Sequence, residues 1–220
     1  MRRFIALMPL VALLSACVDI PQAPKRQPVR RSTLVYTPRP DQQQCLTGLG
    51  AAQAAFTPLP DQYFGAGCST LGTVRLTSLR SDHAALGLSN IGPVTCPLAN
   101  ALAGWARFGV DRAARQILGT PLAQIETMGS YSCRTVAGSS RMSAHATANA
   151  VDIGGFVLAD GRHISILADW DSPSPQVRAF LRTVRDSGCK RFDTVLSPEY
   201  NAAHRNHLHV EVGYGRPLCS

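Results

Sequence analysis

The chain has 220 residues, a formal net charge of +8 and 45% hydrophobic residues. That length suits one domain with a sizeable core, and the composition is globular, which excludes a largely disordered chain. Part of the positive charge lies near the N-terminus, outside the stretch expected to form the core.

Residues 1–16 are predicted to be a targeting segment. Two arginines precede the apolar stretch Phe4–Leu14, which is too short to span a bilayer as a mature helix. Leu14–Cys17 resembles a bacterial lipoprotein box, with cleavage before Cys17 and lipid on its sulfur; the alternative is a plain secretory signal. We therefore expect an exported, periplasmic protein that a lipid on Cys17 anchors to the cell-envelope membrane.

Residues 17–44 are predicted to be a linker. Prolines recur along it and three glutamines end it, so it buries too little apolar surface to fold. Its basic residues would adhere weakly to anionic lipid headgroups, or would only keep the tether soluble. Nucleic acid is not an expected partner, because an exported chain meets little of it and these basic residues lack an aromatic platform.

Of the seven cysteines, all but Cys17 follow the linker. An even number after an export signal indicates disulfides formed in an oxidising compartment. The absence of C-x-x-C spacing argues against a thiolate metal site. Several pairings are open, and proximity along the chain favours Cys45–Cys68, Cys96–Cys133 and Cys189–Cys219.

The first part of the folded domain, residues 45–220, carries few chemical signals. Leu46–Val94 is predicted to be an N-terminal subdomain or packing layer, with a short strand at Thr73–Leu79. Cys96–Gly119 is predicted to be a helix, because apolar residues recur every three or four positions and form one core-facing stripe. Ala123–Arg134 is predicted to be a strand that runs into a loop.

The second part alternates strands with one more helix. A β-hairpin is predicted over Ala150–Ile166, with its turn at Asp160-Gly161. Gln176–Ser187 has the pattern of an amphipathic helix, and Arg191–Leu196 and His207–Val212 are predicted to be adjacent strands. Together these elements predict an α+β fold: a small, mainly antiparallel sheet with packed helices, stapled by disulfides.

One stretch and one distant tripeptide carry residues that bind divalent metals. Ser143–Asp152 reads S-A-H-A-T-A-N-A-V-D, and strand alternation later puts His207, His209 and Glu211 on one face. Two imidazoles and a carboxylate with an open fourth position are typical of a catalytic zinc site. The competing interpretation is a polar strand face and an ordinary loop histidine, with no metal. The predicted ligands are His145, Asp152 and His209.

The pattern S-x-H-x-x-A-x-A-x-D followed by H-x-H resembles a zinc peptidase group. That group includes D-alanyl-D-alanine carboxypeptidases, L-alanyl-D-glutamate endopeptidases and the hedgehog signalling domain. More closely, Cys45–Cys219 is similar to the bacterial extensin-like C-terminal family. The shared phrases are C-P-L-A at Cys96–Ala99, G-S-Y-S-C-R at Gly129–Arg134, N-A-V-D-I-G-G-F at Asn149–Phe156, L-S-P-E-Y-N at Leu196–Asn201 and H-R-N-H-L-H-V-E-V at His204–Val212.

The resemblance implies a zinc-peptidase core, a Zn²⁺ ion and a set of catalytic residues. His207 would lie just outside the metal's ligands and stabilise an oxyanion or shuttle a proton. Related enzymes carry a glutamate near the final His-x-His as general base, but here those positions hold Ala203–Asn206. Glu199 and His204 are the candidates for that role, while Glu211 lies a further strand repeat away.

The resemblance also implies an arginine that grips the substrate's carboxylate. In the peptidase group this arginine follows a tyrosine, whereas here Tyr131 is followed by Ser132. Arg134 and Arg141 therefore compete for the role, which suits arginine because its planar fork pairs bidentately with carboxylate. Ser143 is also expected to contact substrate.

Two functions are consistent with these features. The first is a zinc-dependent peptidase that acts on peptidoglycan stem peptides, which an anchored envelope protein can reach. The alternative is a non-catalytic, metal-containing module for cell-wall binding or envelope assembly, as the hedgehog resemblance suggests.

Overall fold

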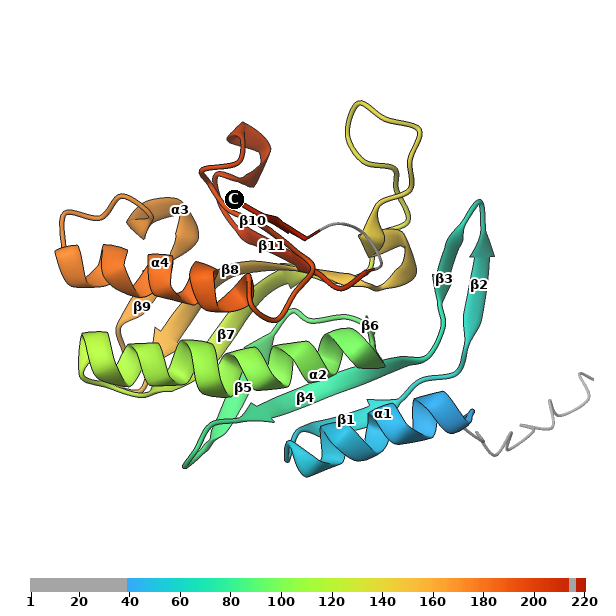
Figure 1. Cartoon of the computed structure of the whole chain (residues 1–220), viewed down its shortest axis with the longest axis horizontal. Helices are drawn as coiled ribbons and strands as arrows, with labels where there is room; N and C mark the ends of the chain where they lie inside the picture. The colour runs from blue at the N-terminus through green and yellow to red at the C-terminus, as the bar shows by residue number, and fades with distance from the viewer. Residues whose placement is uncertain (1–38, 214–216) are drawn as a thin grey trace, which may run out of the picture. The chain divides into compact units, whose positions relative to one another are not determined.

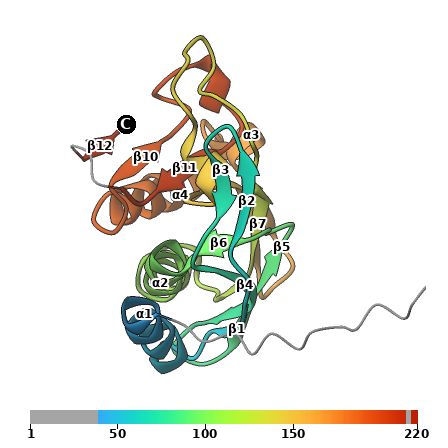
Figure 2. The ribbon, with the colours of Figure 1, turned by 90° about the vertical axis from the view of Figure 1, so that its right-hand side faces the viewer.

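A ten-stranded mixed β-sheet runs through the folded part of the chain, and helices pack along one of its faces (Figures 1 and 2). The computed structural model describes residues 39–213 and 217–220. The predicted signal segment, the lipidation site Cys17 and most of the predicted linker lie outside these residues. Helix α1 (Pro40–Ala51) begins inside the predicted linker. Its proline suits the first helical turn, and Gln42 is buried, so this end of the linker packs onto the folded domain.

The main sheet has the order β1-β4-β5-β7-β8-β11-β10-β12, with β6 beside β4 and β9 beside β8. Neighbouring strands are antiparallel except for β5–β7 and β10–β12, which are parallel. This arrangement confirms the α+β class and the mainly antiparallel pairing, but the sheet has ten strands and is not the small sheet predicted. The strands are β1 (Ala55–Pro58), β2 (Gln62–Gly65), β3 (Cys68–Thr70), β4 (Thr73–Arg80), β5 (Ala85–Ser89), β6 (Val94–Thr95), β7 (Leu122–Gly129), β8 (Ala150–Leu158), β9 (His163–Ser165), β10 (Thr194–Leu196), β11 (Leu208–Glu211) and β12 (Leu218–Cys219).

The interpretation of Leu46–Val94 as a subdomain or separate layer is wrong. Strands β1, β4 and β5 from this segment belong to the main sheet, and only the hairpin β2–β3 forms a sheet of its own. Strand β4 confirms the strand predicted at Thr73–Leu79, and its buried leucines include Leu76 and Leu79. The sequence thus indicated the strand correctly, but it did not show which sheet the strand would join.

The helix predicted over Cys96–Gly119 is confirmed. It begins as α2 (Cys96–Trp105) and continues through two π-helical stretches, Ala106–Asp111 and Ala114–Leu118. It ends at Gly119, whose φ of 73° is a left-handed conformation that glycine adopts without strain. None of the described helices combines the length and the apolar run that a membrane span requires.

The core lies between this helix, the second long helix and the sheet. Helix α4 (Pro175–Gly188) confirms the amphipathic helix predicted there, and a short helix, α3 (Ile166–Asp169), precedes it. Trp105 is fully buried, and its indole N–H donates to the Val184 carbonyl oxygen of α4 at 3.1 Å. The Trp105 ring packs near the ring of Phe156 on β8, at a centroid distance of 6.2 Å. An aromatic cluster therefore joins both helices to the centre of the sheet.

The strands that carry the metal motif are neighbours in the sheet. Strands β8 and β9 form the predicted hairpin, with Gly161 in its turn at a φ of 87°. Strands β10 and β11 are adjacent in the sheet, as predicted, and they pair antiparallel. Strand β8 lies between β7 and β11, so residues from distant parts of the sequence meet at its first half.

The disulfides are Cys45–Cys96, Cys68–Cys133 and Cys189–Cys219. All six cysteines after the linker are paired, and the third predicted pair is confirmed. The first two predicted pairs are wrong, because closeness along the chain does not reflect closeness in the fold. Helix α1 packs on α2, which brings Cys45 to Cys96, and the β2–β3 hairpin stands beside the loop after β7, which brings Cys68 to Cys133.

Candidate metal centre

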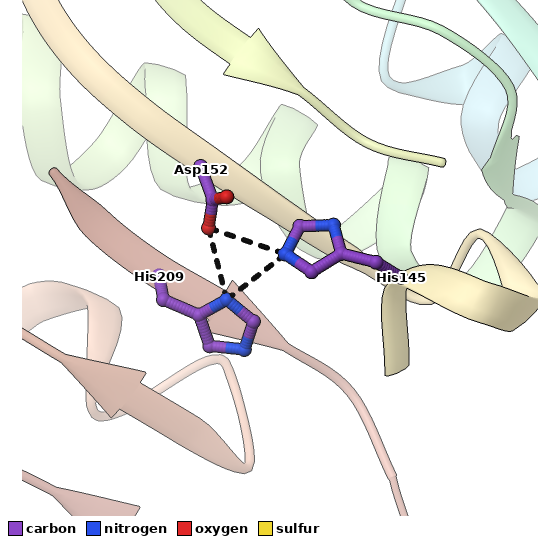
Figure 3. Close-up of side chains that lie close together, drawn as sticks. All are labelled: His145, Asp152 and His209. Atoms are coloured by element: carbon purple, nitrogen blue, oxygen red, sulfur yellow. Dashed lines mark hydrogen bonds and ion pairs between the residues drawn. The ribbon is translucent and has the colours of Figure 1, made fainter. Parts of the chain in front are cut away.

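Three side chains from three separate elements converge at the sheet (Figure 3). His145 comes from a 3₁₀ turn (Ala144–Thr147), Asp152 from β8 and His209 from β11. Asp152 and His209 are direct partners in the antiparallel register of β8 and β11. The sheet pairing therefore sets two of the three side chains opposite each other, and the turn adds the third.

The ligand atoms of this group are spaced as a metal site requires. His145 Nε2 lies 3.2 Å from His209 Nδ1 and 3.3 Å from Asp152 Oδ1, and His209 Nδ1 lies 2.9 Å from Asp152 Oδ1. Zinc–ligand bonds of about 2.0–2.2 Å in a tetrahedron place neighbouring ligand atoms about 3.3–3.5 Å apart. The buried His-Asp-His group can hold a metal with only a small outward movement of its side chains.

Contacts behind His145 fix its orientation. Its Nδ1 lies 2.7 Å from the Ser130 carbonyl oxygen, which can only accept, so Nδ1 carries a proton and Nε2 faces the group, where it would present its lone pair to a bound metal. The backbone N–H of His145 donates to the Ser143 hydroxyl at 3.3 Å. Ser143 is thus buried as the cap of the 3₁₀ turn, and its predicted contact with substrate stays a prediction.

His209 is oriented by a carboxylate on its own strand. Its Nε2 lies 3.1 Å from Glu211 Oε2. A proton on Nε2 donates to this carboxylate and leaves Nδ1 to face Asp152 and a metal. The alternation predicted for the strand is confirmed, but the sequence did not indicate that Glu211 would hold a ligand histidine in place.

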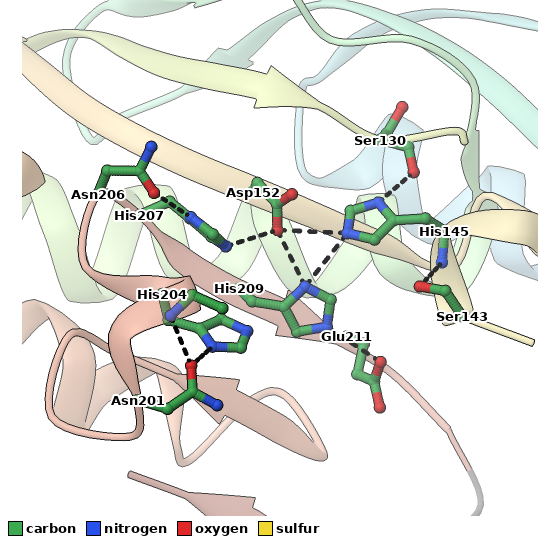
Figure 4. Close-up of polar contacts among 11 residues, drawn as sticks. Ser130, Ser143, His145, Asp152, Asn201, His204, Asn206, His207, His209 and Glu211 are labelled. Carbon is green, nitrogen blue, oxygen red and sulfur yellow. Dashed lines mark hydrogen bonds and ion pairs between the residues drawn. The ribbon is translucent and has the colours of Figure 1, made fainter. Parts of the chain in front are cut away.

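Two further histidines lie beside the three potential ligands (Figure 4). His207 Nε2 is 3.4 Å from Asp152 Oδ1, and its Nδ1 is 2.8 Å from Asn206 Oδ1. His204 donates from Nδ1 to Asn201 Oδ1 at 2.7 Å, and its ring centroid lies 5.1 Å from that of His207. Each ring is therefore held by an asparagine at Nδ1, and its Nε2 points away from that asparagine.

The comparisons with known proteins give one match. The family model for the extensin-like protein C-terminus matches residues 43–220, most of the chain. The chain belongs to the extensin-like C-terminal family. No curated protein and no solved structure matches it. For this extensin-like domain, the likeness to zinc peptidases therefore rests on the metal motif alone and stays a prediction.

The charges at the centre of the extensin-like domain are strongly coupled. Burial alone would raise the pKa of Asp152, but hydrogen bonds from His145 and His209 outweigh it and hold that pKa well below its usual range. Burial alone would lower the pKa of His209, yet its hydrogen bonds with Asp152 and Glu211 raise it to about 9. Without a metal, the group thus holds an aspartate and a protonated histidine at neutral pH.

The pKa values of the two outer histidines, His204 and His207, are lowered, opposite to the shift of His209. Burial lowers the pKa of His204 to about 4, and the nearby His207 and His209 add to the effect. Burial also lowers the pKa of His207, although Asp152 opposes the shift. Both rings are therefore neutral at pH 7 and able to accept a proton.

The two arginines proposed to bind substrate lie within electrostatic reach of the centre. The charge of Arg134 is among the causes that lower the pKa of His204 and of His207. The charge of Arg141 is among the causes that lower the pKa of Glu211. Both side chains are largely exposed on the loop between β7 and the 3₁₀ turn, so neither is committed to a structural ion pair within the described residues.

Glu199 is not placed to act as the general base. Its carboxylate pairs with Arg182 of α4 at 2.9 Å and also with Arg185 of α4. Among the described residues, none of its polar contacts reaches the histidines. The sequence pattern did not show these arginines as partners of Glu199, because they lie on helix α4, well before Glu199 in the chain.

Proposed function

We propose that this extensin-like domain is a zinc-dependent hydrolase that acts on the stem peptides of peptidoglycan. The observation that carries the proposal is the convergence of His145, Asp152 and His209 beside two neutral histidines. Three protein ligands and a free position are typical of catalytic rather than structural zinc sites. When bound, the ion would supply Lewis-acid chemistry at the peptide carbonyl.

The donor set favours zinc over other metals. Two imidazoles and one carboxylate suit zinc, whereas calcium and magnesium prefer oxygen ligands alone. The cysteines of the described domain do not compete as ligands, because all six are in disulfides. The contacts that Ser130 and Glu211 make with the ligand histidines are those expected around a zinc site.

His204 is the best candidate for the general base. Asn201 holds its Nδ1–H, which leaves the lone pair on Nε2 to take the proton of an attacking water. His207 lies between His204 and Asp152, and we propose that it relays the proton taken up by His204 to the leaving amine. Arg134 and Arg141 would bind the carboxylates of an acidic stem peptide.

The cellular setting is proposed from the sequence and the disulfides. Three disulfides suit an oxidising compartment such as the periplasm. We propose that lipid on Cys17 anchors the chain to the envelope membrane, where peptidoglycan is within reach. Mass spectrometry of the N-terminal peptide tests this, since an unmodified or uncleaved Cys17 would contradict it, and Cys17→Ser should release the protein from membranes.

One observation favours the alternative, a non-catalytic module that binds cell wall or assists envelope assembly. Both nearby glutamates are engaged, Glu199 by the arginines of α4 and Glu211 by His209. In this alternative the metal would stabilise the fold or the binding surface, and the histidines would have no proton to move.

Metal analysis combined with peptidoglycan digestion separates the two functions. The full chain should load about one zinc and release soluble peptides from purified peptidoglycan. His204→Ala should keep the zinc and lose peptide release, whereas His145→Ala should lose both. A zinc-loaded wild type that sediments with peptidoglycan but releases nothing would establish the alternative. Arg205→Ala, an exposed neighbour of His204, is the matched control and should behave as wild type.

A further inference from the structure

Two aromatic rings form an exposed shelf next to the metal centre. Phe64 of β2 and Tyr131, two residues after the end of β7, have their ring centroids 5.4 Å apart. Phe64 is 52% exposed, and Tyr131 is partly exposed. Clusters of exposed apolar side chains often mark binding surfaces. We call this pair the Phe64–Tyr131 shelf.

The shelf is fixed in place although it contributes little to the core. Strands β2 and β3 form a separate two-stranded sheet, and all four residues of β2 are exposed. Such a hairpin is marginally stable in water on its own. The disulfide Cys68–Cys133 ties it to the loop that carries Tyr131, and both segments rise side by side from the body in Figures 1 and 2.

The shelf is continuous with the metal centre. Tyr131 lies between Ser130, whose carbonyl oxygen accepts from His145 Nδ1 at 2.7 Å, and Ser132, whose N–H donates to the His145 carbonyl oxygen at 3.1 Å. The backbone on both sides of Tyr131 thus holds a proposed metal ligand. A ligand that rests on Tyr131 therefore contacts the same loop that holds His145.

A small hollow of about 320 Å³ adjoins the shelf, and its lining is uncharged. Tyr131 forms one wall, and the loop before β6 forms the other. Asn90 is the lining residue with a side-chain amide, and the Ser130 hydroxyl donates to the Pro93 carbonyl oxygen at 2.8 Å. By contrast, the charges of Arg134 and Arg141 act on the histidines and on Glu211. The lining residues are Asn90, Ile91, Gly92, Pro93, Gly129, Ser130 and Tyr131.

We propose that the Phe64–Tyr131 shelf and the adjoining hollow bind a sugar ring of the peptidoglycan glycan strand. The inference rests on the proposed function, because it takes peptidoglycan as the ligand. Peptidoglycan joins an acidic peptide to sugar rings, and the two sides of the site match these parts. The arginine side suits carboxylates, whereas an aromatic face with amide partners suits the C–H face and the polar edge of an uncharged ring.

Binding of peptide-free glycan strands tests the proposal without requiring any peptide cleavage. The full chain is titrated with glycan strands from which an amidase has removed the stem peptides, and Kd is measured by calorimetry. Phe64→Ala and Tyr131→Leu should each raise Kd about tenfold. Phe108→Ala is the matched control, because Phe108 is an exposed aromatic at 43% on the long helix, packed among arginines. Its Kd should stay within about twofold of wild type.

The outcomes separate this proposal from the proposed function. Glycan binding that both shelf variants weaken supports the shelf, even if wild type releases no peptide from intact peptidoglycan. A wild type that releases peptide but does not bind peptide-free strands overturns the shelf and leaves the hydrolase standing. Equal weakening by Phe108→Ala would also overturn it. Tyr131→Leu keeps an apolar side chain but removes the ring, and equal melting temperatures of variant and wild type show that its effect is not unfolding.

Discussion

Asp152 and His209 face each other across the pairing of β8 and β11, and Asp152 Oδ1 lies 2.9 Å from His209 Nδ1. This pairing makes the sheet itself part of the metal centre, because a shift of either strand by one residue would turn its ligand side chain to the other face. Only His145 depends on a loop, and that loop is held by the Ser130 carbonyl oxygen.

We predict that Asp152→Asn abolishes metal loading. An amide oxygen carries no negative charge and is a poor zinc ligand, so the group would retain only two strong donors. Metal content measured after dialysis against zinc should fall from about one ion per chain to none. Asp160→Asn is the matched control, since Asp160 is exposed in the β8–β9 turn and pairs only with Arg162 among the described residues. Equal metal content in Asp152→Asn and wild type would contradict the assignment.

We predict that Glu211→Gln weakens zinc binding without removing it. The carboxylate of Glu211 accepts from His209 Nε2, and loss of such a partner costs about 10–100-fold in metal affinity. Competition with a chelator measures the change. Glu126→Gln is the control, because Glu126 pairs with the exposed His163 at 2.5 Å in a similar His–Glu contact away from the three ligands. A Glu211→Gln variant with wild-type affinity would show that Glu211 has no such role.

Much of this centre could be predicted from the sequence, and the failures have physical causes. Strand alternation placed His207, His209 and Glu211 on one face because side chains alternate with a period of two. The motif identified His145 and Asp152 correctly as neighbours in the fold. Local patterns contain no information on which distant segments pack together, which is why the partners of Cys45, Cys68 and Glu199 were missed. The Ser130 carbonyl oxygen is a backbone group, so the residue type at that position does not predict its hydrogen bond with His145.

We predict that zinc binding releases about one proton at pH 7. The pKa of His209 is raised to about 9 in the metal-free protein, above its usual value of about 6.5, so the protonated form is stabilised. This contribution to the stability of the metal-free fold is complete below pH 6.5 and is lost as the pH rises through 9. Zinc competes with that proton, so its apparent affinity should rise about tenfold per pH unit between pH 7 and 9.

Calorimetry in buffers with different heats of protonation counts the released proton. Hydrogen bonds with Asp152 and Glu211 raise the pKa of His209. Glu211→Gln should therefore lower that pKa, so that zinc binding releases the His209 proton over a lower range of pH. Release of no proton at pH 7, with affinity independent of pH above 7, would show that His209 is already neutral in the metal-free protein.

The last prediction concerns the disulfide that fixes the β2–β3 hairpin. Cys68 and Cys133 are 65 residues apart, and in the chain-entropy model a loop of that size stabilises the folded state by about 4 kcal/mol. The double variant Cys68→Ser/Cys133→Ser should therefore lower the free energy of unfolding in denaturant by up to that amount. It should also weaken binding of glycan strands, because the hairpin loses its tie to the loop of Tyr131.

Cys189→Ser/Cys219→Ser is the matched control, with a separation of 30 residues. It should cost about 3.5 kcal/mol of stability by the same model and leave glycan binding unchanged. Equal loss of glycan binding in both double variants would mean that general destabilisation, not the position of the hairpin, accounts for the effect.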